Sequence, residues 1–150
     1  MTATAHAVIG TIIAAKIGNP GLAIPLAFAS HIVLDTIPHW DTATNGRKKE
    51  KIKKIFKKSV LDVVSGFILS FGIIIFLFPD TNIQYAFLLI LVSQSLDWLT
   101  APYYFLNIKF PPFFQIYKFQ KMFDRKMDKP WGIITQVAII LLLITLAKTF

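Results

Sequence analysis

Five apolar segments alternate with polar stretches along the chain and predict a helical membrane protein. They cover residues 4–17, 21–37, 59–78, 83–100 and 131–147. A helix needs about 20 apolar residues to cross a bilayer, within a range of about 17–25. The third segment is long enough to span, and we expect the fourth and fifth to span as well.

The first two segments differ from the others in length and composition. Segment 4–17 is short, and Pro25 interrupts segment 21–37. Small residues dominate both, which favours close helix packing in lipid, and the Gly-Asn-Pro-Gly at 18–21 is typical of a tight turn. We therefore expect a helical hairpin shielded by the other helices. The predicted fold is an all-α integral membrane bundle of about four to five transmembrane helices, in one domain over residues 1–150.

Composition agrees with a membrane location. Of 150 residues, 55% are hydrophobic, and the mean hydropathy is +0.59, which is too apolar for a typical soluble domain. The N-terminus lacks the basic region of a cleaved signal peptide, since its first apolar run carries His6 early and Lys16 late, so we expect it in the mature protein. The chain has no cysteine, which excludes disulfides and thiolate metal ligands.

The positive charge is concentrated in two loops. The formal net charge is +8, and loops 41–58 and 107–130 hold eight and six of the sixteen Lys and Arg residues. Five alternating helices place both loops on one side, and basic loops mark the cytoplasmic side. This pattern predicts a multi-pass protein with a cytoplasmic N-terminus, and it explains the charge without nucleic acid as a partner.

Both basic loops have features typical of a membrane surface. Within 47–58, Ile52, Ile55 and Phe56 follow helical spacing, which predicts a short basic amphipathic helix on an anionic lipid leaflet; a plain cytoplasmic loop is the compatible alternative. Pro102 is expected to break the fourth helix. The aromatic stretch 103–123, interleaved with lysines, favours an interfacial belt over a single-stranded nucleic-acid site.

Candidate chemistry is densest at the end of the second apolar segment. His31 and Asp35 are four residues apart, so a helix places them on one face. Pro38 then ends or bends the helix, so His39 and Asp41 lie just beyond the helix end. Imidazole and carboxylate ligands suit zinc or another first-row divalent ion. The alternative is a helix end whose polar residues meet water.

Three other ionisable residues are expected at the same membrane depth. The topology places His6, Asp62 and Asp97 near the cytoplasmic ends of the first, third and fourth helices. Ionisable groups inside spans are costly and usually mark function. Aspartates that face one another would repel unless a cation held them together. We therefore predict a site for a divalent metal ion, most simply zinc, and the number of ligands allows two ions. The predicted metal ligands are His6, His31, Asp35, His39, Asp62 and Asp97.

Each of these residues also has a simpler interpretation. His6 could be a packed or interfacial histidine, and Asp62 and Asp97 could cap helix ends or reach water. Asp41 could cap a following helix. These alternatives stay open at the level of the sequence.

The N-terminal quarter of the chain resembles a known family. Thr4-Ala5-His6, followed by His31-x3-Asp35-x2-Pro38-His39-x-Asp41, is similar to the membrane-bound metal-dependent hydrolases, which are small prokaryotic inner-membrane proteins. More distantly, the second motif resembles part of the zinc-dependent phospholipase C site. The resemblance covers residues 4–41 and implies an inner-membrane location and hydrolase activity. No histidine follows His39, where the family commonly has a further histidine motif, so Asp62 and Asp97 would supply the remaining ligands.

The expected function is divalent-metal-dependent hydrolysis at the cytoplasmic membrane face, on a phosphoester or lipid-like substrate. Asp41 is the candidate general base, provided that its carboxylate is not fully engaged. Two alternatives remain. One is a transporter or proton relay that uses intramembrane Asp and His. The other is a non-enzymatic membrane scaffold with a structural metal or none.

Overall fold

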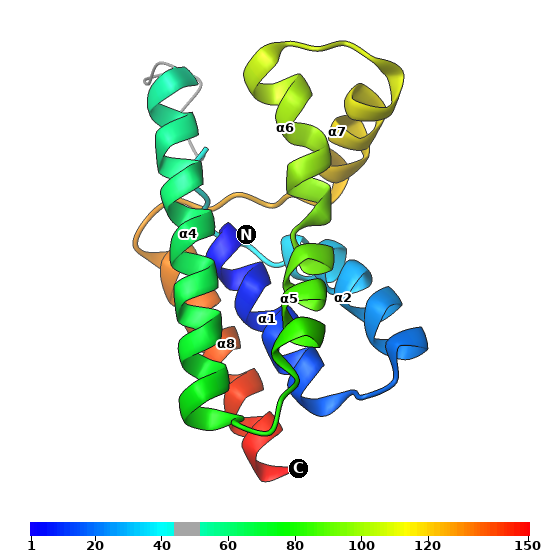
Figure 1. Cartoon of the computed structure of the whole chain (residues 1–150). Coiled ribbons are helices and arrows are strands. Elements are labelled where there is room, and N and C mark those ends of the chain that lie inside the picture. Colours follow the sequence, from blue (N-terminus) through cyan, green and yellow to red (C-terminus); the bar gives the residue numbers. More distant parts are fainter. Residues whose placement is uncertain (44–51) are drawn as a thin grey trace.

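The computed structural model describes residues 1–43 and 52–150 and is all-α over those residues, as expected (Figure 1). Its helices there are α1 (Ala3–Lys16), α2 (Pro20–Asp35), α4 (Ile52–Leu77), α5 (Ile83–Ser93), α6 (Ser95–Leu106), α7 (Pro111–Phe123) and α8 (Trp131–Thr149).

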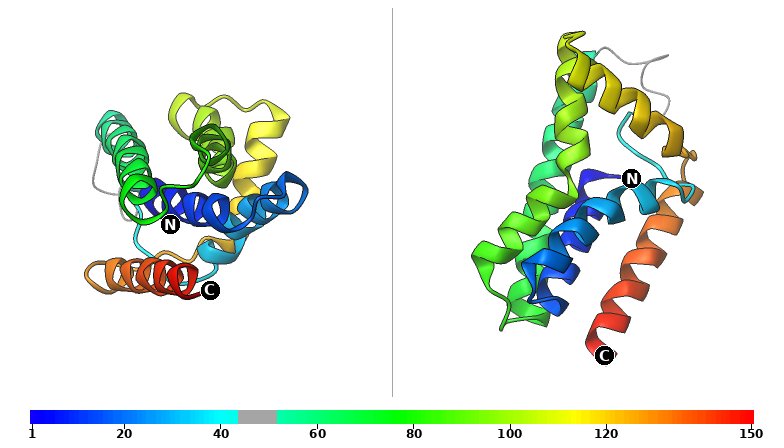
Figure 2. Two further views of the ribbon diagram at one scale, coloured as in Figure 1. Left: turned by 60° about the horizontal axis from the view of Figure 1, so that its bottom comes forward. Right: turned by 90° about the vertical axis from the view of Figure 1, so that its right-hand side faces the viewer.

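Helix α1 is the centre of the bundle. Its residues from Ala5 to Ala14 are buried, and α2, α4, α5 and α8 all pack against it; Figure 2 shows these helices around it. The helix approaches its neighbours closely at two glycines. A Cβ on Gly10 would lie 2.6 Å from Ser93 Oγ, and one on Gly66 of α4 would lie 3.0 Å from Thr4 Cα. Small residues thus bring the helices together, as their enrichment predicts.

The predicted hairpin between the first two helices is present. Asn19 caps α2 by accepting a hydrogen bond from the Gly21 backbone N–H at 2.8 Å, and Pro20 occupies the first helical position, where proline costs no hydrogen bond. Pro25 lies inside α2 without interrupting it.

The fourth apolar segment breaks at a different place from the one predicted. Pro102 lies inside α6, so the expected break at that proline is wrong. The chain bends instead by 46° at Gln94, between α5 and α6. The α6 helix ends at Asn107, whose φ of 55° is the left-handed conformation that terminates many helices. Packing of α7 against α6 supports this extension, since Tyr103 contacts the rings of Phe114 and Tyr117 at 5.1 and 4.8 Å.

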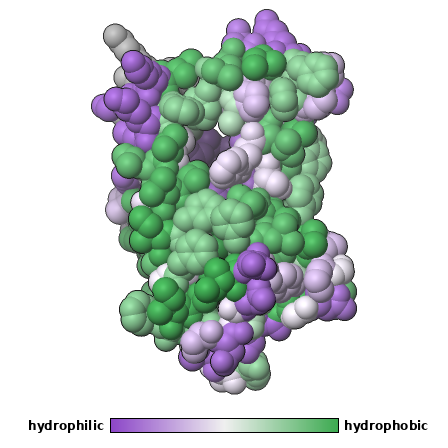
Figure 3. All heavy atoms as spheres, in the orientation of Figure 1, coloured by the Kyte–Doolittle hydropathy of each residue, from purple (hydrophilic) through white to green (hydrophobic). Residues whose placement is uncertain are grey.

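Within residues 1–43 and 52–150, two helices are long and apolar enough to cross a membrane, α4 and α8, and the bent α5–α6 pair is a third candidate. The basic residues of 52–58 form the first turns of α4 rather than a separate helix; the rest of the predicted amphipathic segment, residues 47–51, lies outside the described residues. Figure 3 shows an apolar band over the visible flank of the molecule, with hydrophilic residues gathered at both ends.

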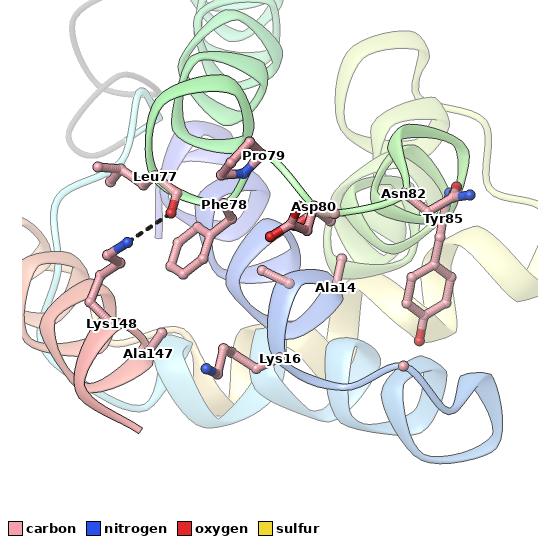
Figure 4. Close-up of a pocket in the computed structure, with 13 residues that line it drawn as sticks. Ala14, Lys16, Leu77, Phe78, Pro79, Asp80, Asn82, Tyr85, Ala147 and Lys148 are labelled. Carbon is pink, nitrogen blue, oxygen red and sulfur yellow. Dashed lines mark hydrogen bonds between the residues drawn. The ribbon is translucent and has the colours of Figure 1, made fainter.

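A cavity of about 850 Å³ lies at the end of the bundle where α8 terminates (Figure 4). Lys16, Asp80 and Lys148 are among its lining residues, and Lys148 Nζ donates to the Leu77 carbonyl at 3.0 Å. The buried apolar residues of α1, including Val8, Ile9 and Ile12, separate this cavity from the N-terminal end of the helix.

Candidate metal centre

The buried carboxylate of Asp35 lies at the centre of three histidines. The α-helical spacing of α2 puts His31 one turn before Asp35, and His31 Nε2 lies 3.4 Å from Asp35 Oδ2. His6 Nε2 and His39 Nε2 lie 3.2 and 3.8 Å from Asp35 Oδ1. Asp35 is 2% exposed, and the three histidines are buried at 0–1% exposure. Residues at the end of α2 and the start of α1 therefore form one cluster that is buried from solvent.

His6 enters this cluster from the first turn of α1. Its ring stacks on that of His31, with centroids 3.8 Å apart and planes 6° from parallel. Among the described residues, no hydrogen-bond partner meets either ring nitrogen of His6. Burying an imidazole that makes no well-aligned hydrogen bond is costly, and the contact that Nε2 has is the Asp35 carboxylate at 3.2 Å.

The break at Gln94 fixes the orientation of His31. In an uninterrupted helix the Ser93 carbonyl would accept from the Asp97 N–H, but that N–H donates to Gln94 O at 3.1 Å instead. The Ser93 carbonyl therefore accepts from His31 Nδ1 at 2.7 Å. Because Nδ1 must carry the proton for this bond, a neutral His31 ring would point the lone pair of Nε2 toward Asp35.

His39 is held in the same way by the segment after α2. Its Nδ1 donates to the Ile37 carbonyl at 2.8 Å, which leaves Nε2 facing Asp124 Oδ1 at 3.1 Å. The linker between α7 and α8 pairs with this segment through its backbone: His39 N donates to Arg125 O at 3.0 Å, and Arg125 N donates to Asp35 O at 3.0 Å. These bonds bring Asp124 to the cluster from a distant part of the sequence.

With His31 and His39 neutral, their Nε2 lone pairs face the carboxylate oxygens of Asp35 and Asp124, and a cation between such acceptors would offset their repulsion. Two ligand atoms at about 2.0–2.1 Å from a tetrahedral zinc ion are roughly 3.3 Å apart, which fits the 3.2 and 3.4 Å separations of His6 and His31 from Asp35. In the part of the chain that the structure describes, two groups of side chains have ligand atoms that all lie within 4.8 Å of one another, and each group could hold a metal ion. The first is His6, His31 and Asp35, and the second is His39, Asp41 and Asp124.

Two positive charges of the protein lie against these carboxylates. The amino group of Met1 contacts Asp35 Oδ1. Lys126 Nζ lies 2.6 Å from Asp41 Oδ2 and 3.3 Å from Asp124 Oδ2. Burial alone would raise the pKa of Asp124, but the His39 contact and the Lys126 ammonium outweigh it and lower that pKa. The two carboxylates in turn raise the pKa of Lys126, against the opposing effect of its burial.

The structure brings most of the predicted site residues together. His6, His31, Asp35 and His39 converge directly. Asp97 lies at the edge of the first group, with Oδ1 at 3.6 Å from His31 Nε2. Asp41 belongs to the second group, but it is paired with Lys126 and accepts from the Ala43 N–H, so its assignment as a general base remains a prediction.

Asp62 lies elsewhere and makes different contacts. Its carboxylate accepts from the Ala3 N–H at 2.8 Å, the Thr4 N–H at 3.2 Å and the Thr4 hydroxyl at 2.7 Å. It thus caps the N-terminus of α1 from α4, and it is in neither of the two groups found among the described residues. This geometry favours the capping interpretation that the sequence left open.

Sequence reasoning missed Asp124, Lys126 and Gln120. Gln120 Nε2 donates to Asp97 Oδ1 at 2.7 Å and lies 3.2 Å from His31 Nε2. A signal for Asp124 was present: it is one of the acidic residues in basic loop 107–130, which the topology places on the same side as the cluster.

Comparisons of the chain with protein-family models, with curated proteins and with solved structures found no match.

Proposed function

We propose that the protein is a membrane-embedded, divalent-metal-dependent hydrolase whose site opens at the cytoplasmic face, in line with its resemblance to the membrane-bound metal-dependent hydrolases. The observation that carries the proposal is the set of imidazole Nε2 atoms directed at one buried carboxylate, Asp35. Zinc is the metal that this nitrogen and oxygen donor set suits best.

The residues present fit such an ion. His6 and His31 would bind through Nε2 and Asp35 through its carboxylate, while the Ser93 carbonyl keeps His31 in the ligating tautomer. When bound in such a site, a divalent ion lowers the pKa of a water molecule toward about 7 and polarises the bond to be cleaved. Asp97, which Gln120 holds beside His31, is placed to accept a proton from that water or to orient it.

The arrangement of helices supports a membrane location. We propose that α4, α8 and the bent α5–α6 pair cross the inner membrane, with the α1–α2 hairpin packed among them. The basic start of α4 and the α6–α7 connection form the upper end of the molecule in Figure 1, and the N-terminus lies between that end and the C-terminal end of α8. Basic residues favour the cytoplasmic side, so the metal centre would face the cytoplasmic leaflet and its anionic lipids.

An opening in the flank of the molecule supports an amphiphilic substrate. Figure 3 shows a hollow between α4 and α6, with hydrophilic atoms at its floor, apolar residues on the α4 side and residues of intermediate hydropathy on the α6 side. Aromatic contacts join α4 to its neighbours. The ring centroids of Phe56 and Phe105 of α6 are 5.1 Å apart, and those of Phe67 and Phe87 of α5 are 5.7 Å apart. An amphiphile could place its phosphoester in such an opening while its apolar chain stays in the bilayer.

The alternative of transport has less support. A transport path would have to cross from the metal centre to the cavity at the far end of the bundle (Figure 4). The buried apolar residues along α1, among them Val8, Ile12 and Ile13, stand between the two. A charged substrate on that path would lose its hydration without polar partners.

The proposal is tested by metal content and phosphoester cleavage together. Detergent-purified protein should retain at least one equivalent of zinc by elemental analysis, and it should release phosphate from phosphatidic acid in mixed micelles. Asp35→Asn should lose both, whereas Asp80→Asn, at the far end of the bundle, should lose neither. Less than half an equivalent of metal in the wild-type protein, unchanged in Asp35→Asn, would overturn the proposal.

A further inference from the structure

A pair of buried atoms beside the first metal group has no assigned role. His39 Nε2 and Asp124 Oδ1 are 3.1 Å apart, and within the described part of the chain neither forms a hydrogen bond. His39 has no exposed surface. Its Nδ1 proton is committed to the Ile37 carbonyl, so a neutral His39 would direct a lone pair at a carboxylate oxygen. Such an arrangement is unfavourable unless a proton or a metal ion lies between the two atoms.

One tetrahedral ion cannot use all of these donors. His6, His31 and Asp35 fill three positions, and an open position is needed for water or substrate in a catalytic site. Asp35 has two oxygens, and both face imidazole nitrogens: Oδ2 faces His31, and Oδ1 faces His6 and His39. The carboxylate therefore contacts the histidines of both groups, and a second ion would take the place of the Met1 amino group at Oδ1.

From these contacts we infer that Asp35 bridges two divalent cations, and that His39 Nε2 and the Asp124 carboxylate bind the second. The inference rests on the proposed function for the first ion and adds a ligand, Asp124, that the sequence motifs do not contain. Asp41 belongs to the same group, although its carboxylate is already engaged by Lys126 and the Ala43 N–H.

Backbone hydrogen bonds hold together the two segments that carry the ligands of the second metal site. The segment Pro38–Trp40 lies beside the linker that follows α7, with a parallel bridge between His39 and Lys126. Met127 N donates to His39 O at 2.6 Å, and Trp40 N donates to Gly132 O at 3.1 Å. These bonds hold the two ligand-bearing segments in register, which lowers the cost of ordering them around an ion.

Lys126 has a defined place in this arrangement. It contacts the Oδ2 atom of Asp124, whereas His39 faces Oδ1 of the same carboxylate. The ammonium therefore orients Asp124 and leaves Oδ1 directed at the second ion. Its positive charge at this short range also opposes binding of a cation and sets a limit on the affinity of the second site.

The inference can be tested with manganese, whose unpaired electrons report on a neighbouring ion. The full-length protein in detergent would be stripped with chelator, loaded with Mn²⁺, and examined by elemental analysis and electron paramagnetic resonance. Two ions at the about 3.5–4 Å separation of two-metal sites give an exchange-coupled spectrum. We expect two equivalents and a coupled signal in the wild-type protein. The variants Asp124→Asn and His39→Gln should each retain one equivalent with an uncoupled signal.

The control is Asp128→Asn, which changes an acidic residue of the same linker and should keep two coupled ions. One uncoupled equivalent in the wild-type protein, unaltered in Asp124→Asn, would overturn the second site and leave the first intact. No bound manganese and no bound zinc in the wild-type protein would overturn the proposed function as well. Because the wild-type spectrum alone decides between one ion and two, a variant that fails to fold does not remove the test.

Discussion

Changing Asp62 to asparagine is predicted to lower the stability of the protein and leave metal binding unchanged. Changing Asp35 to asparagine is predicted to weaken metal binding instead. Asp62 accepts three hydrogen bonds from the first residues of α1, at 2.7–3.2 Å. The Asp62→Asn change keeps the shape of the side chain and one acceptor oxygen, but it replaces the other oxygen with an amide NH2 group, which donates and cannot accept from a backbone N–H. It also removes a negative charge from a helix N-terminus.

The size of the effect follows from these contacts. A hydrogen bond to a charged group contributes about 1.5–3 kcal/mol to stability, and a charge at a helix N-terminus contributes about 0.3–1 kcal/mol. Losing one such bond and the charge should lower the free energy of unfolding by about 2–4 kcal/mol. For a chain of this length that is a fall of about 4–16 °C in Tm. Metal content should be unchanged, because Asp62 is in neither metal-binding group among the described residues.

Asp35→Asn should affect metal binding instead. Zinc binding by structural sites is worth about 10–16 kcal/mol, or about 2.5–4 kcal/mol for each of four ligands, so losing this carboxylate should weaken binding roughly 10²- to 10³-fold. Tryptophan fluorescence during heating in detergent measures Tm, and elemental analysis after dialysis measures bound metal. If Asp62→Asn released the metal while its Tm stayed at the wild-type value, Asp62 would be a ligand and the capping assignment would be refuted.

Three further predictions concern Lys126, the α1–α5 contact and the topology. Lys126→Met should tighten binding of the second ion by about tenfold, because it removes a competing positive charge; isothermal titration with Mn²⁺ measures this, and weaker binding would contradict it. Gly10→Ala should destabilise the protein by about 1–3 kcal/mol, since its Cβ would lie 2.6 Å from Ser93 Oγ; an unchanged Tm would argue against this packing. Because the chain has no cysteine, Lys57→Cys and Asp80→Cys can be labelled singly with a membrane-impermeant maleimide; in right-side-out vesicles only the second should react, and the reverse pattern would invert the proposed topology.

Local signals predicted much of the fold. Hydrophobic run lengths identified the helical class, and the Gly-Asn-Pro-Gly turn located the hairpin between α1 and α2. The i,i+4 spacing of His31 and Asp35 placed both on one face, and the structure keeps them there. Each of these features depends on residues close together in the sequence, which is why composition and spacing were sufficient.

The helix break could not be predicted from the residues at which it occurs. Pro102 was the expected position because it lacks an N–H, yet aromatic packing between α6 and α7 supports the helix through it. Gln94 has no strong local preference for breaking a helix. The bend there is accompanied by the bond from His31 to the Ser93 carbonyl, which is a contact between distant segments.

The same limit applies to the candidate site. An aspartate near a helix end has the same sequence signature whether it caps another helix or binds a metal, so Asp62 and Asp35 could not be told apart. Asp124 reaches His39 only because the linker after α7 pairs with the segment after α2 through backbone hydrogen bonds. Those bonds involve no particular side-chain type and leave no pattern in the sequence.

X-ray absorption at the zinc edge tests the central claim most directly, because it reports the atoms around the ion itself. For zinc-loaded wild-type protein we predict nitrogen and oxygen ligands at about 2.0–2.1 Å, with the outer-shell scattering of imidazole rings. In Asp35→Asn the bound zinc and its imidazole signal should be lost together. Zinc that is retained without imidazole scattering, or a wild-type protein that binds no zinc, would contradict the account.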